Sequence, residues 1–169
     1  TAGMTPALYT ASVPVFLHYL TRIEGLMSHA TPDLLTRRLA ADMFPLGQQM
    51  ATAMRLTLRV SYPLAGRAVP GDVGAGTDAA GLGVRLDVTR AALGALRPAD
   101  FEGAEGRMIA HVAGFSELEQ SGADFLHLFG MPNFLFHTGM AFAILRVNGA
   151  AIGKADFDGL HDYPPGFSF

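Results

Sequence analysis

The chain has 169 residues, of which 50% are hydrophobic and only 16% are charged. This length suits one ordinary domain, and the low charge favours a large core or a buried partner surface. The net charge of −3 and the scatter of the 12 basic residues exclude the basic stripe that nucleic-acid binding requires. Because cysteine is absent, disulfides, thiolate metal sites and a cysteine nucleophile are excluded, and we expect a cytoplasmic protein.

Two long helices, with a short one between them, are predicted in the first half of the chain. The first runs from about Leu8 to Ser28 because apolar residues recur there at spacings of three and four: Val13, Phe16, Leu20, Ile23 and Met27. In "TPDLLTRRLA", Thr31 is the expected N-cap of the short helix and Pro32 its first residue. The second long helix follows "DMFP" and should stop near Tyr62-Pro63, because proline disfavours helix in the residue before it. Its expected buried face is Leu46, Met50, Ala53, Thr57 and Val60.

The second half opens with a glycine-rich connection, from Ala65 to Gly83. Residues 82–96 fit both a strand and a helix, and their length and the alanines of "TRAALGAL" favour a helix. The stretch "RMIAHVAGFSELEQ" predicts a hairpin. The last long helix should begin at Ser121 or Asp124 and end at Asn148-Gly149, followed by irregular chain.

These elements predict an all-α four-helix bundle with a short β-hairpin before the last long helix. We expect one domain over residues 8–160 and an irregular tail over residues 161–169. Residues 1–3 precede Met4, which resembles a native start, and we interpret them as an added extension. No basic region followed by an apolar run is present at the N-terminus, so no signal peptide is expected.

The stretch from Phe125 to Leu145 holds 21 consecutive residues without a formal charge, which is enough to span a bilayer. A single span would leave the other amphipathic helices without a packing counterpart and would place Asn133 and His137 in lipid. We therefore predict no membrane partner. The glycine-rich "GAGTDA", residues 74–79, fits a dinucleotide fingerprint only on paper, because no strand precedes it, and a loop is predicted instead.

The histidines of the last helix have distinct expected roles. His127 and His137 are ten residues apart, about 15 Å along a helix, and cannot share a metal ion. Asn133 and His137 form a polar pair on an apolar face with Leu126, Phe129, Met140 and Ile144. If buried, both need partners, which could be each other, another helix, water or a ligand. His18 lies nearly opposite the apolar stripe of the first helix, where solvent or a partner subunit is its expected contact.

Four segments of the chain resemble a known family. They are "LYTASVPVFLHYL" from Leu8, "LAADMFPLGQQ" from Leu39, "DFEGAEGR" from Asp100 and "PNFLFHTGMAFAILRVNGAAIGKADF" from Pro132. They resemble the domain-of-unknown-function family numbered nineteen ninety-three, across roughly Leu8 to Leu160. That family is similar to the DinB/YfiT-like metalloenzyme superfamily, which implies an up-down-down-up bundle and often a homodimer.

The resemblance also implies a site. Superfamily enzymes include metal-dependent transferases and isomerases that use low-molecular-weight thiols, with one histidine from the second long helix and two from the last in an H-x-x-x-H pattern. Here Asn133 stands at the first position of that pair and His137 at the second, while residues 44–62 contain no histidine. The resemblance implies a ligand pocket that consists of Asn133, His137, Gln49 and Met50. Of these, His137 alone matches a metal ligand of the superfamily, and the implied metal is a divalent ion.

Two functions remain open from the sequence. One is a small-molecule, thiol-dependent transferase or hydrolase with a degenerate metal site, in which His137 is a residual ligand or a general base. The other is a non-enzymatic dimeric binding or structural protein that has lost the metal. There the flexible side chains of Met50, Met54, Met131 and Met140 would repack the former site.

Overall fold

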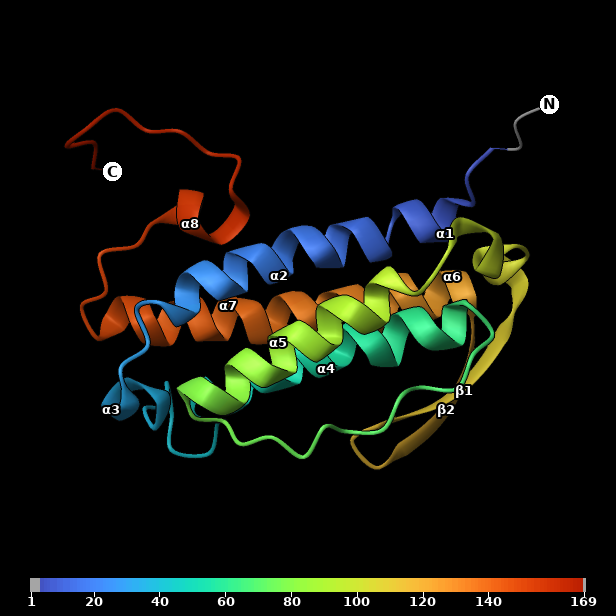
Figure 1. Ribbon diagram of the computed structural model, residues 1–169, viewed down its shortest axis with the longest axis horizontal. Coiled ribbons are helices and arrows are strands. Elements are labelled where there is room, and N and C mark those ends of the chain that lie inside the picture. The colour runs from blue at the N-terminus through green and yellow to red at the C-terminus, as the bar shows by residue number, and fades with distance from the viewer. Residues whose placement is uncertain (1–3, 169) are drawn as a thin grey trace.

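The computed structural model describes residues 4–168, so the extension predicted at residues 1–3 lies outside the described residues. Within that range the chain is mostly helical, and its long helices lie side by side along the long axis of the molecule (Figure 1). They are α2 (Val13–Met27), α4 (Leu46–Leu64), α5 (Ala79–Gly94) and a continuous last segment built from α6 (Gly122–Asp124), η3 (Phe125–Gly130) and α7 (Met131–Val147).

The first predicted helix is broken into two pieces. Two residues separate a short helix, α1 (Ala7–Thr10), from the start of α2. Pro14 causes the break because its ring has no N–H to donate and would clash with the carbonyl group of Thr10 in a continuous helix. Ser12 fills the gap, and its Oγ donates to the backbone oxygen of Leu8 at 2.5 Å.

The second long helix ends later than predicted. The helix α4 continues through Pro63 to Leu64, where the chain turns at Gly66 with a φ of +66°. The backbone N–H of Arg67 donates to the oxygen of Tyr62 at 2.9 Å, which is the closing bond of a glycine-terminated helix. Before α4, the short helix α3 (Pro32–Leu35) is capped as predicted, since Thr31 Oγ1 accepts from the N–H of Leu34 at 3.4 Å.

The glycine-rich connection is shorter than predicted, because α5 already begins at Ala79. Asp78 caps this helix by accepting from the N–H of Gly81 at 2.8 Å. A Cβ atom at Gly81 would lie 2.4 Å from the carbonyl oxygen of Gly76, so glycine is required for the loop to fold against the helix. The choice of helix over strand for the stretch that begins at Leu82 is confirmed, and the helix ends at Gly94.

The predicted hairpin is present. Two short 3₁₀ turns, η1 (Pro98–Phe101) and η2 (Ala104–Gly106), lead into β1 (Met108–Ala113), which pairs antiparallel with β2 (Ser116–Ser121). Ala113 pairs with Ser116 across a two-residue turn. Ser121 then caps the last helix, as predicted, by accepting from the N–H of Asp124 at 3.2 Å.

The last helix contains a π-helical turn that the sequence pattern did not indicate. In η3 each backbone bond reaches one residue further than in an α-helix, and one residue corresponds to about 100° of rotation. The buried side of α7 is therefore displaced by one position from the predicted face, to Phe134, Thr138, Ala141 and Leu145. Asn133, His137 and Met140 are half-buried at its edge, while Leu126 and Ile144 are buried as predicted.

The chain after Asn148 was predicted to be irregular, but it forms one more helix, α8 (Lys154–Asp158). This helix packs on α2. The ring centroid of Phe157 lies 5.7 Å from that of Tyr19 and 5.9 Å from that of Phe142. His18 is exposed to solvent, as expected, and it also contacts its own chain, since its Nε2 lies 2.6 Å from the backbone oxygen of Asp158. Residues 161–168 are without helix or strand, as predicted.

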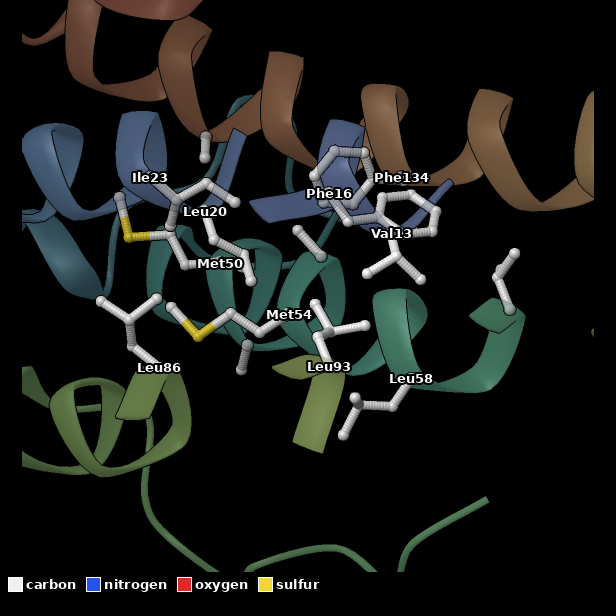
Figure 2. Packing of buried hydrophobic residues seen from close by; sticks show 14 of the residues in the cluster. Val13, Phe16, Leu20, Ile23, Met50, Met54, Leu58, Leu86, Leu93 and Phe134 are labelled. Carbon is white, nitrogen blue, oxygen red and sulfur yellow. The ribbon is translucent and has the colours of Figure 1, made fainter. Parts of the chain in front are cut away.

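The core lies between the four long helices. Figure 2 shows Phe16 and Leu20 of α2, Met50 and Met54 of α4, and Phe134 of α7 directed into the same interior. The rings of Phe16 and Phe134 meet edge to face, with centroids 5.0 Å apart. This contact joins α2 to α7, and α4 packs along α7 beside it. The candidate site lies at the junction of α4 and α7.

The last helical segment, Gly122–Val147, is the one span of the described chain that is long and apolar enough to cross a membrane. Its 26 residues include a window with a mean hydropathy of 1.4, of which 33% is buried inside the molecule. Core helices of soluble proteins meet the same criteria. Because only a third of its most apolar stretch is buried, part of the apolar surface of this helix faces outward.

Candidate functional site

His137 and Gln49 form the polar contact between α7 and α4. The Nδ1 atom of His137 lies 2.7 Å from Oε1 of Gln49, across 88 residues of sequence. Gln49 is almost fully buried and its Nε2 donates to the backbone oxygen of Phe44 at 3.3 Å. The ring of Phe44 stacks on that of His137, with centroids 6.0 Å apart, so the imidazole is held from two sides.

This arrangement fixes the tautomer of His137. A carbonyl oxygen can only accept, so the amide nitrogen of Gln49 must face Phe44 and its oxygen must face the histidine. His137 therefore donates from Nδ1, which leaves the lone pair of Nε2 available. Burial lowers the pKa of His137 from its ordinary value of 6.5, so the ring is neutral at neutral pH.

His137 lies at the edge of a groove with a volume of about 570 Å³. One wall is the outer face of α4, and the other parts are the glycine-rich loop and the tip of the hairpin at Gly114. The lining residues are Phe44, Gln48, Ala51, Thr52, Arg55, Leu56, Arg59, Asp72, Arg85, Gly114 and His137. A small molecule can therefore reach the imidazole from a groove lined by both apolar and polar side chains.

The four predicted pocket residues lie in different surroundings. Gln49 and His137 are in direct contact, as given above. Asn133 bonds to neither, because its Nδ2 donates to the backbone oxygen of Phe129, one turn back in its own helix, at 2.6 Å. Met50 is fully buried in the core and does not line the groove.

These residues do not fit a zinc or similar divalent site. His137 is the one imidazole among the described residues that line the groove. Its Nδ1–H group already donates a hydrogen bond to Oε1 of Gln49. Amide groups are weak ligands for such ions. Across residues 4–168, no three histidine or acidic side chains are grouped in a way that could hold a metal ion.

The arginines of the groove were missed as site residues. Gln48, Thr52, Arg55 and Arg59 recur at spacings of four, three and four along α4, so they share one face of the helix. That spacing is visible in the sequence, but such a stripe is normally a solvated helix surface. It becomes one wall of a groove because the glycine-rich loop folds beside it, where Arg55 donates to the oxygen of Pro70 at 2.6 Å.

Arg85 of α5 fixes the same loop from the other side. Its Nη1 lies 2.7 Å from Oδ1 of Asp72, and its other nitrogens donate to the backbone oxygens of Ala75 and Gly76. The hydrogen bond and charge of Arg85 hold the pKa of Asp72 below its ordinary value, with the N–H of Gly74 adding to the effect. The loop that the sequence left unexplained thus forms part of the site.

Comparison with known proteins supports the fold and leaves the activity open. No curated protein matches the sequence. The structure is similar to the crystal structure of a DinB family member protein from Shewanella denitrificans, with a TM-score of 0.82 and 28% sequence identity over 93% of this chain and 94% of that one. The model of the domain of unknown function DUF1993 matches residues 8–158. This match covers most of the chain, and the protein therefore belongs to the DUF1993 family.

Proposed function

We propose that this protein is a small-molecule transferase or hydrolase of the DinB type that works without a metal, with His137 as the general base. The observation that carries the proposal is the bond from Nδ1 of His137 to Gln49, which leaves Nε2 as a proton acceptor beside an accessible groove. A neutral imidazole can take a proton from a water molecule or from the S–H group of a thiol substrate. The lowered pKa of His137 keeps it in that neutral form.

We also infer the up-down-down-up helix order of the DinB superfamily. It is supported by the return of the glycine-rich loop, which runs back along the molecule before α5 begins (Figure 1). Gly47, in the first turn of α4, lies so close to the loop that a Cβ atom there would be 2.4 Å from the backbone oxygen of Thr77. The starts of α4 and α5 are thus neighbours.

The proposed catalytic role is tested with p-nitrophenyl acetate, an activated ester that needs a base to direct water or a thiol. We expect wild-type protein to release p-nitrophenol faster than His137→Ala and His137→Gln, by about 100-fold if general-base catalysis operates. His127→Ala is the matched control, because His127 is exposed on the same helical segment. Added Zn²⁺ should leave the wild-type rate unchanged. Equal rates for wild type and folded His137 variants would refute the role, and stimulation by zinc would refute its independence from metal.

The alternative is a non-enzymatic dimer, for which the outer side of the last helix is the specific evidence. Leu128, Phe136 and Val147 are 68%, 50% and 69% exposed there. Large apolar side chains in such a row on one helix favour an interface with a second copy. A dimer is compatible with catalysis in the groove, so the ester assay decides between the two functions.

A further inference from the structure

The groove beside His137 has a wall rich in hydrogen-bond donors. Gln48, Thr52, Arg55 and Arg59 line it from one face of α4. Nε2 of Gln48 donates to Oγ1 of Thr52 at 3.2 Å, so the hydroxyl hydrogen of Thr52 remains available as a donor. Donors in this number favour a ligand that accepts hydrogen bonds.

Among its lining residues the groove carries more positive than negative charge, because the one carboxylate, Asp72, interacts with Arg85 and at longer range with Arg55. Arg85 is paired with Asp72, and Asp72 is the one carboxylate that lines the groove. Arg55 and Arg59 each donate to a backbone oxygen, at 2.6 Å and 3.2 Å, which leaves their charges in place. In the described part of the chain, no carboxylate lies within ion-pair distance of Arg55 or Arg59. Both are half-buried, so solvent screens them less than a free surface arginine.

Arg59 connects this charge to an aromatic pocket. The pocket has a volume of about 270 Å³ and lies between α4, the hairpin and the π-helical turn, with Arg59, Val69, Phe125 and Phe129 among its lining residues. The guanidinium carbon of Arg59 lies 6.0 Å from the ring centroid of Phe129. The rings of Phe125 and Phe129 are stacked, with centroids 5.5 Å apart. The ring of His111 also lines the pocket, with its centroid 4.4 Å from that of Phe129. The pocket is therefore lined in part by aromatic rings, which favour a ligand with an aromatic group.

From this arrangement we infer that the groove and the pocket together bind a small organic carboxylate with an aromatic body. The carboxylate accepts charge-assisted hydrogen bonds from Arg55 and Arg59, and the body fills the pocket beside Phe129. The inference rests on the proposed function, since it names the class of molecule on which Nε2 of His137 acts. Binding and catalysis use different side chains, so the two ideas can fail separately.

The test is isothermal titration of the full chain with phenylacetate, acetate and phenylacetamide. Acetate keeps the charge without the ring, and phenylacetamide keeps the ring without the charge. We expect phenylacetate to bind at least about tenfold more tightly than either, since both parts contribute. Arg59→Gln and Arg55→Gln should each weaken phenylacetate binding about tenfold. Arg97→Gln is the control and should change nothing, because the Arg97 side chain is 80% exposed and lines neither the groove nor the pocket.

Three results would overturn the inference. They are equal affinity for phenylacetate and phenylacetamide, equal affinity for phenylacetate and acetate, or unchanged affinity in both groove arginine variants. Thermal unfolding of each variant checks that it is folded, and Phe129→Leu adds a variant that keeps an apolar side chain but should reduce the preference for the ring. The ester assay on His137→Ala separates the two ideas. Phenylacetate binding that depends on both arginines, together with unchanged ester hydrolysis in His137→Ala, would refute the catalytic role and leave the anion site standing.

Discussion

His137 links the stability of the protein to pH. Burial lowers its pKa in the folded state, so between that pKa and 6.5 the unfolded chain takes up a proton that the folded chain does not. The contribution of His137 to stability is complete above 6.5 and is lost as the pH falls through this window. We expect the free energy of unfolding of wild type relative to His137→Gln to decrease between about pH 7.5 and pH 5.5.

Urea unfolding of both proteins at several pH values measures this difference. The glutamine variant has no titrating group at the position, and the other histidines contribute equally to both proteins and cancel. A difference that is constant across the range would show that the imidazole is not held neutral. An increase at low pH would show that the folded state favours the imidazolium.

At the residue scale, the resemblance placed His137 and Gln49 in one pocket, but the hydrogen bond between them was not predicted. An apolar helix face with two polar side chains required partners for both, and each has one. The hydrogen bond between Gln49 and His137 depends on how α4 and α7 pack together. These residues are 88 positions apart, and no local sequence pattern encodes the packing of helices so far apart in the chain. Asn133 instead bonds within its own helical segment, to the backbone oxygen of Phe129 one turn back.

At the scale of elements, start and stop signals predicted most boundaries, and breaks inside helices were missed. Thr31 is an N-cap as predicted, and of the two predicted starts of the last helix, Ser121 and Asp124, Ser121 is the N-cap. The break at Pro14 and the π-helical turn are harder to predict from sequence. Apolar residues continue through both at nearly helical spacing, so the repeat is displaced only slightly. The helix α8 was missed because "YPPG" nearby favours irregular chain and the helix is only five residues long.

The start of α5 offers a matched pair of glycine substitutions. Gly81→Ala would place a Cβ atom 2.4 Å from the oxygen of Gly76, so we expect a loss of about 1–3 kcal/mol in the free energy of unfolding, as for other overpacked sites. Gly83→Ala meets no atom within 4 Å, and alanine should stabilise the same helix by up to about 1 kcal/mol. Chemical denaturation measures both. Equal effects in the two variants would show that the loop does not need its close approach to α5.

At the scale of the whole molecule, one helix combines two roles. The inner side of the last helical segment packs against α4 and carries His137, while its outer side leaves large apolar residues exposed. The sequence predicted an apolar helix but not which side remains open, because the π-helical turn rotates α7 relative to a regular helix. Only 33% of the most apolar stretch of this helix is buried inside the molecule. The neighbouring helices therefore leave part of its hydrophobic surface uncovered.

We therefore expect a homodimer in which the outer sides of two last helices pack together, burying Phe136 of each copy. Phe136→Glu should convert the dimer to a monomer, because an unpaired carboxylate in an apolar interface costs several kcal/mol. Val84→Glu is the matched control, since Val84 is 51% exposed on α5 and Phe136 is 50% exposed on α7. Multi-angle light scattering at micromolar concentration gives the mass of each. A monomeric wild type would contradict the interface, as would a monomeric Val84→Glu variant, and recovery of wild type only with detergent would favour a membrane as the partner of this helix.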